Sequence, residues 1–171
     1  MAIYMKFDGL DGHVTTEGHE KWIEIDSYDW NILRKVAGET TPGNVANREA
    51  NKPTINPLEF TKPLDKTTPD LFKKICVGKA FSKVELHICK TDDKLSPYME
   101  YVFEDVLITK YQIETKQGSD SNGQPSGIPV PRERVGLSFT KVEMKFTPHD
   151  KTGAAESPLP ASYDLTTATA A

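Results

Sequence analysis

Short runs of alternating apolar and polar residues recur along the chain. This period of two predicts β-strands, whose successive side chains point to opposite faces. Ile3, Met5 and Phe7, for example, fall on one face of the first such run. Further strand-like runs occupy residues 22–30, 54–62, 84–89, 98–115 and 135–147. Because closing a sheet on itself removes exposed strand edges, the pattern predicts a mainly β fold, an antiparallel β-barrel.

One segment departs from this period and predicts a single short α-helix flanking the barrel. Thr68 suits the N-cap of this helix, Pro69 suits its first turn, and Gly78 ends it as a left-handed cap. Phe72 and Cys76 lie one turn apart, and we expect them on the buried side. The predicted helix is about nine residues long.

Three long polar segments rich in Gly, Pro, Ser and Asn are predicted to be loops, and they span residues 8–19, 38–53 and 116–131. The apolar period ends after Phe146. We therefore expect one folded domain at residues 1–147 and a flexible C-terminal tail at residues 148–171.

Composition narrows the classes of partner. The chain has 171 residues, 37% of them apolar and 27% charged, with a formal net charge of −4. A mildly acidic protein gains little from counterion release at phosphates, so nucleic acid is not an expected partner. There is no apolar run long enough for a transmembrane helix, so we expect no membrane insertion. The N-terminal residues lack the basic and apolar regions of a cleaved signal peptide, so we expect none.

Residue types common in active sites are present, but their spacing matches none of the standard catalytic or metal motifs. His13 and His19 lie among acidic residues without the spacing of a zinc site. We expect His87 and Cys89 to point to opposite faces of their strand, which would leave the thiol without an activating base. A nucleophile elbow and a phosphate-binding loop are also missing from the sequence. The sequence therefore predicts a protein that is not an enzyme and has no metal or cofactor.

Four segments, in order, resemble one family. They are AIYMKFDGLDG at residues 2–12, HEKWIEIDSYDW at 19–30, FTKPLDKTTPDLFKKICVGKAF at 60–81 and LSFTKVEMKF at 137–146. Together they resemble the Hcp (haemolysin-coregulated protein) family of type VI secretion systems. The third is similar to a strand-to-helix signature of that family, and the fourth to its closing strands.

The resemblance implies an architecture and a role. Members of the family form a small β-barrel with a helix at its side, and six copies assemble into a homo-hexameric ring. Rings stack into a tube that a contractile sheath propels, tipped by a VgrG-type spike protein. The tube protein is made in the bacterial cytoplasm, is itself secreted, and can carry effectors in its lumen.

The resemblance also places subunit contacts. Segment 38–53 corresponds in position to the extended loop that the family uses for ring stacking. In addition, the run at residues 22–30 mixes aromatic and acidic side chains on one face, which suits a surface that meets another subunit. The residues expected to make stacking or subunit contacts are Thr41, Pro42, Gly43, Asn44, Arg48, Glu49, Trp22 and Trp30.

Three other hypotheses remain open from the sequence. A monomeric β-barrel that binds a small ligand would need an apolar interior cavity. An enzyme could use the acidic and histidine residues of segment 8–20. A phage tail-tube subunit would share the tube mechanism and differ in genetic setting.

Overall fold

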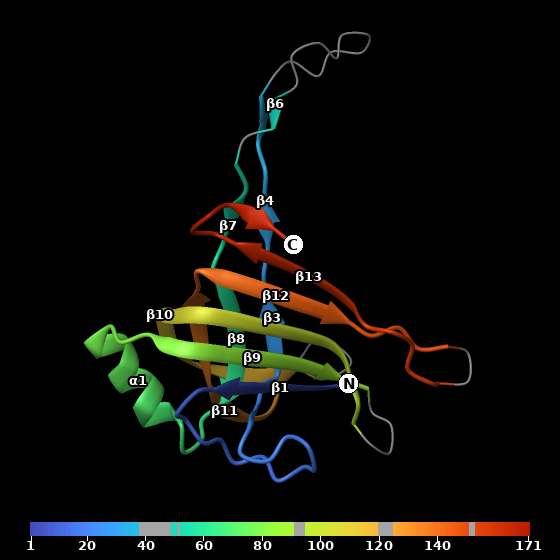
Figure 1. Ribbon diagram of the computed structural model, residues 1–171. Helices are drawn as coiled ribbons and strands as arrows, with labels where there is room; N and C mark the ends of the chain where they lie inside the picture. The colour runs from blue at the N-terminus through green and yellow to red at the C-terminus, as the bar shows by residue number, and fades with distance from the viewer. Residues whose placement is uncertain (38–48, 51, 91–94, 120–124, 151–152) are drawn as a thin grey trace.

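A computed structural model describes residues 1–37, 49–50, 52–90, 95–119, 125–150 and 153–171. The fold is mainly β, all of its strand pairs are antiparallel in this part of the chain, and one short helix flanks the sheets (Figure 1). The first strand behaves as its pattern predicts: in β1 (Ala2–Phe7), Ile3, Met5 and Phe7 are buried in the core.

One long bent strand, β10 (Pro97–Ser119), joins two sheets. Its first half pairs with β9 (Phe81–Cys89) on one edge and β12 (Lys141–Phe146) on the other. Its second half pairs with β11 (Pro125–Ser138). The core fills the space between the sheets, with Phe7, Phe60 and Phe103 among its largest buried side chains.

The remaining strands extend each sheet outward. The first sheet continues from β9 to β1 and then to β2 (Ile23–Glu24). The second continues from β11 to β8 (Leu58–Pro63) and then to β3 (Ser27–Asp29).

The predicted closed barrel is not what the described strands form, because their hydrogen-bonded path stays open between β2 and β3. Consecutive residues nevertheless bond to both sheets at this point. The Ile25 amide donates to the Ile3 carbonyl at 3.0 Å, and the Asp26 amide donates to the Thr61 carbonyl at 2.8 Å. The alternation at residues 22–30 therefore breaks into two short strands where the chain passes from one sheet to the other.

The predicted helix is confirmed as α1 (Thr68–Val77), with Thr67 rather than Thr68 at the N-cap. Gly78 ends it in the left-handed conformation, with φ 69°, and its amide donates to the Lys74 carbonyl at 2.9 Å. The expectation that Cys76 is buried is wrong, because the helix presses Leu71 into the core and leaves the Phe72 and Cys76 side exposed.

Two segments predicted to lack regular structure contain strands. Within the predicted loop 116–131, β10 continues to Ser119 and β11 begins at Pro125, and the two strands pair. In the predicted tail, β13 (Leu159–Asp164) adds to the edge of β12, and β14 (Thr169–Ala170) adds to β13. The segment 148–171 therefore contains regular structure that its sequence pattern does not indicate. Strand addition uses backbone hydrogen bonds, which need no apolar period.

An extended β-hairpin projects from the sheets within residues 31–55 (Figure 1). At its base β4 (Ile32–Leu33) pairs with β7 (Thr54–Ile55), and farther out β5 (Val36–Ala37) pairs with β6 (Glu49–Ala50). Of the predicted loop 38–53, the structure describes residues 49–50 and 52–53, and Glu49–Ala50 form strand β6 of this projecting hairpin.

Candidate functional site

An apolar groove lies where the projecting hairpin leaves the sheets. It has a volume of about 330 Å³ and is bounded by the hairpin base and by β12, β13 and β14. Its apolar lining residues include Trp30, Ile55, Met144 and Tyr163, and Arg34 and Ser162 supply its polar groups. An open apolar groove of this kind suits contact with another protein surface.

Trp30 is fixed in the wall of this groove by contacts on both its ring and its nitrogen. Its Nε1 donates to the Asn56 carbonyl at 3.0 Å. Its ring makes edge-on contacts with Tyr101, Phe103 and Phe139, with centroids 5.7–6.1 Å apart. Trp30 therefore joins the core to the groove, and its orientation is set before any partner arrives.

The hairpin itself exposes apolar side chains. Ile32 is 49% exposed, Leu33 59% and Val36 46%. A two-stranded ribbon has no second layer to cover these side chains. Exposed apolar residues next to an apolar groove mark this part of the surface as a candidate interface.

The predicted contact residues fall in three places. Trp30 lines the groove, and Glu49 lies in β6, opposite Ala37. Trp22 lies elsewhere, in a cluster beside β1. The other predicted residues lie outside the described part of the chain: Thr41, Pro42, Gly43, Asn44 and Arg48.

Trp22 packs with two histidines rather than on the hairpin side. The His19 Nε2 lies 3.0 Å from the His87 Nδ1, and the Trp22 ring contacts both imidazoles at centroid distances of 4.9 and 4.4 Å. Tyr4 stacks near His19 at 4.7 Å. The cluster attaches the segment after β1 to β9.

Burial lowers the pKa of His19 and of His87, because removing an imidazolium from water favours the neutral ring. Carboxylates oppose this effect. Glu20 acts to raise the pKa of His19, and Glu100 and Glu85 act to raise that of His87. The net lowering of both pKa values favours the neutral rings, in which one of the two facing nitrogens donates and the other accepts.

The expectation that His87 and Cys89 point to opposite faces is wrong. Residues two apart on a strand share a face. The Cys89 sulfur lies 3.7 Å from the His19 Nε2, and that same nitrogen meets His87. Counting the strand period correctly would have placed these side chains together. The other histidine of this segment, His13, lies 3.3 Å from Asp65 through its Nδ1.

A buried ion pair joins two neighbouring strands of the sheet beside the start of the helix, and sequence reasoning missed it. Lys62 on β8 and Glu133 on β11 form a salt bridge with both side chains 0% exposed. The Lys62 ammonium also lies 2.8 Å from an Asp65 carboxylate oxygen. The Thr68 hydroxyl donates to Glu133 at 3.0 Å and so links the first turn of α1 to this pair.

The charges of this cluster change the pKa values of neighbouring side chains. Burial acts to raise the pKa of Asp65, but hydrogen bonds from Lys62 and Thr67 outweigh it and lower that pKa. Burial raises the pKa of Tyr111, and the neighbouring Glu133 adds to the effect. The sequence did contain a signal for the burial of Lys62. It follows Leu58 and Phe60 at every second position of the strand, so its side chain points to the same buried face.

Within the described ranges, no group of three or more His, Cys, Asp or Glu side chains is arranged to hold a metal ion. The same residues contain no helix with the length and apolar character needed to cross a bilayer.

The fold defines a class: a mainly antiparallel β domain with one short flanking helix and a projecting two-stranded ribbon. A comparison of the sequence with known protein families identifies one family. The sequence model of the family described as "Type VI secretion system effector, Hcp" matches residues 4–146. The chain belongs to this Hcp family.

Individual relatives agree with that membership. Protein Hcp1 of Pseudomonas aeruginosa is 28% identical over 106 residues, which are 61% of this chain. The matched region spans 60% of the length of that relative.

Solved structures show the same fold. One described as a type six secretion system protein has a TM-score of 0.83 at 24% identity and covers 99% of both chains. Hcp1 from Salmonella typhimurium has a TM-score of 0.71 at 24% identity, covering 99% of this chain and 98% of its own. A type VI secretion system effector from Yersinia pestis has a TM-score of 0.67 at 23% identity, covering 95% of this chain and 98% of its own.

Proposed function

We propose that this protein is a structural subunit of the inner tube of a type VI secretion system. Six copies form a ring, rings stack into a tube, and a contractile sheath drives the tube behind a VgrG-type spike. The protein is made in the bacterial cytoplasm and secreted with the tube, with effectors in its lumen. The observation that carries the proposal is the family match over residues 4–146.

The described surface supports ring formation. A cyclic ring uses a heterologous interface, in which two different surfaces of one subunit meet their complements on the neighbours. The apolar groove and the exposed Ile32, Leu33 and Val36 supply apolar area that a monomer leaves in water. We assign the groove, with Trp30 in its wall, to the contact between neighbouring subunits.

The rest of the hairpin serves ring stacking in this proposal, because a projecting ribbon reaches beyond its own subunit. Thr41, Pro42, Gly43, Asn44, Arg48 and Glu49 are the proposed stacking contacts. Closure of the two sheets into a barrel also belongs to the proposal. The point of closure is Ile25–Asp26, where the chain already bonds to both sheets.

A structural role also agrees with how the candidate reactive groups are used. His13 faces Asp65, and His19 and His87 pack against aromatic rings. A ligand-binding barrel is less favoured because the space between the sheets is filled by a continuous cluster of buried side chains. A phage tail-tube role is less favoured because the matching family is a secretion family.

Complementation tests the proposal. The gene is expressed in a type VI secretion-competent bacterium whose own Hcp gene is deleted, and the protein is sought in the culture medium by immunoblotting. Secretion that depends on an intact sheath gene is the expected result. Protein that stays in the cells, or reaches the medium without the sheath, would contradict the tube role.

A further inference from the structure

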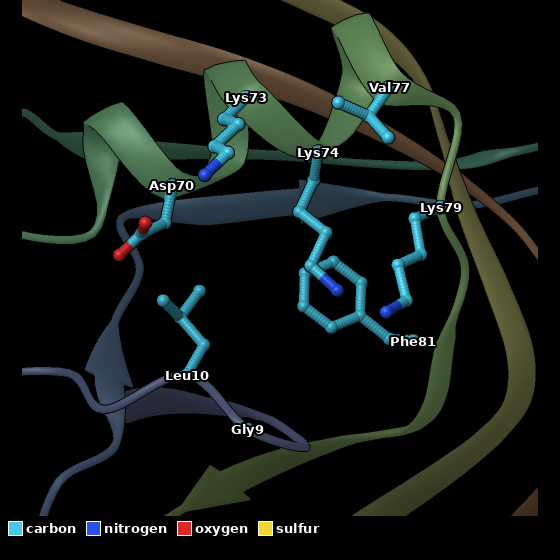
Figure 2. A pocket seen from close by; sticks show the side chains of 8 residues that line it. All are labelled: Gly9, Leu10, Asp70, Lys73, Lys74, Val77, Lys79 and Phe81. Atoms are coloured by element: carbon cyan, nitrogen blue, oxygen red, sulfur yellow. The ribbon is translucent and has the colours of Figure 1, made fainter.

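A second cleft lies on the other side of the molecule from the hairpin base, between α1 and the turn after β1. It has a volume of about 330 Å³ and is lined by Gly9, Leu10, Asp70, Lys73, Lys74, Val77, Lys79 and Phe81. Figure 2 shows the helix along one side of the cleft and the turn at Gly9 and Leu10 facing it. The tube proposal makes no use of this cleft.

The charge of the cleft is opposite to that of the chain. Lys73, Lys74 and Lys79 line it with one carboxylate, Asp70, while the whole chain carries a net charge of −4. Among the residues that the structure describes, none of the three lysines forms an ion pair. The C-terminal end of α1 offsets part of the Lys74 charge.

The floor of the cleft is apolar. Leu10 and Phe81 are buried at its base, and Val77 is exposed at its rim. The Lys74 ammonium lies over the Phe81 ring, 4.3 Å from its centroid, and Figure 2 shows the Lys79 side chain directed toward the same ring. A ligand in the cleft therefore meets the exposed apolar side chain of Val77 together with the lysines.

We propose that this cleft binds an acidic segment of a partner protein. One apolar side chain of the segment packs against Val77 at the rim of the cleft, and its carboxylates face Lys73 and Lys79. Charge complementarity selects this occupant. A nucleic-acid strand fits less well, because its phosphates need a longer basic track than one cleft with Asp70 at its edge.

Fluorescence anisotropy tests the proposal on the full-length protein. The probe is a fluorescein-labelled peptide, Glu-Glu-Leu-Asp-Glu, titrated in about 50 mM and about 300 mM NaCl. We expect saturable binding that weakens at the higher salt. A peptide with Gln and Asn in place of the acids should not bind, and one with Ala in place of Leu should bind more weakly.

Charge reversal locates the binding. The double variant Lys73→Glu/Lys79→Glu should lower the affinity about tenfold, because two attractive contacts become repulsive. Lys35→Glu is the matched control, since Lys35 is an exposed lysine on the hairpin, and it should bind like the wild type. Lys73→Gln/Lys79→Gln should give an intermediate affinity, and circular dichroism checks that each variant is folded.

Three results would overturn the proposal: no saturation up to millimolar peptide, equal weakening by Lys35→Glu, or equal binding of the uncharged peptide. A labelled oligo-dT strand that binds more tightly than the peptide, and loses affinity in the same double variant, would assign the cleft to nucleic acid instead. None of these results bears on whether rings form.

Discussion

Apolar side chains are buried in the sheets but exposed on the projecting hairpin. On β8, Leu58 and Phe60 are buried, and even the charged Lys62 at the next inward position is enclosed. On the hairpin, Ile32, Leu33 and Val36 lie about half exposed although each is strongly apolar. The sheets are covered by their own chain, whereas the ribbon has no layer of its own to cover it.

We therefore expect the sheets to determine the stability of the subunit and the hairpin to determine its assembly. Substitutions inside the sheets should change the free energy of unfolding, because they create cavities or unpaired charges. Substitutions on the hairpin should leave the subunit folded and change which species it forms. Protein concentration must be held fixed in all of these measurements, since subunit association adds to apparent stability.

The largest loss of stability is expected at the buried ion pair. Lys62→Met leaves Glu133 buried without its cation and should lower the free energy of unfolding by about 3–5 kcal/mol. Urea unfolding followed by tryptophan fluorescence measures this change.

The matched control for that variant replaces both partners. Lys62→Met/Glu133→Leu removes both charges of the buried pair and should recover part of the lost stability, because Asp65 still lacks its contact with Lys62. A single variant that loses less than about 1 kcal/mol would show that the buried pair contributes little to stability.

A loss of about 2–3 kcal/mol is expected for Gly12→Ala. A Cβ at Gly12 would lie 2.0 Å from the Trp22 carbonyl oxygen, so the segment must move away from the strand. The movement would break the hydrogen bond from the Gly12 amide to the Lys21 carbonyl, now 2.7 Å long. Thermal unfolding measures the loss, and Thr15→Ala, at an exposed position of the same segment, should stay close to the wild type.

Acid should destabilise the sheets by a smaller amount. The pKa values of His19 and His87 are lowered in the folded protein, so the unfolded chain binds more protons below its ordinary pKa of 6.5. Their contribution to stability is therefore fully present above pH 6.5 and is lost as the pH falls toward the lowered pKa values.

Unfolding midpoints measured between pH 7.5 and 5 test this sign. His87→Gln should flatten the dependence, because one proton-binding group is removed. Glu20, Glu85 and Glu100 and the cation Lys145 face the two imidazoles and stay in place in that variant. A midpoint that rises on acidification would contradict the assignment.

The smallest effect on stability is expected on the hairpin. Leu33→Ser/Val36→Ser should change the free energy of unfolding of the subunit by no more than about 0.5 kcal/mol for each residue, because both side chains are already half exposed. The same variant should lower the ring fraction measured by size-exclusion chromatography. Lys35→Gln, between the two positions, is the control that should form rings like the wild type.

The residues that could be predicted from the sequence are those whose burial follows a local period. The inward positions of β1 and the end of α1 at Gly78 follow from alternation and from glycine chemistry. The edge pairing of β13 and the pairing of β10 with β11 beyond residue 116 rest on backbone hydrogen bonds. Their side chains carry no period, so the sequence indicated a tail and a loop instead.

The candidate site was predictable only in part for a related reason. Trp30 was identified as a contact residue, but the groove beside it forms from β12, β13 and β14, which are far away in the sequence. The Lys62 and Glu133 pair likewise joins two strands 71 residues apart (133 − 62). A local pattern shows that a charged residue points inward, but it does not name the partner.

The solution mass of the purified protein tests whether six copies form a ring. Light scattering at several concentrations, with negative-stain microscopy of the same peak, measures both size and shape. We expect ring-shaped particles of about 115 kDa, six times the 19.1 kDa chain. A monomer of 19.1 kDa at every concentration would contradict it.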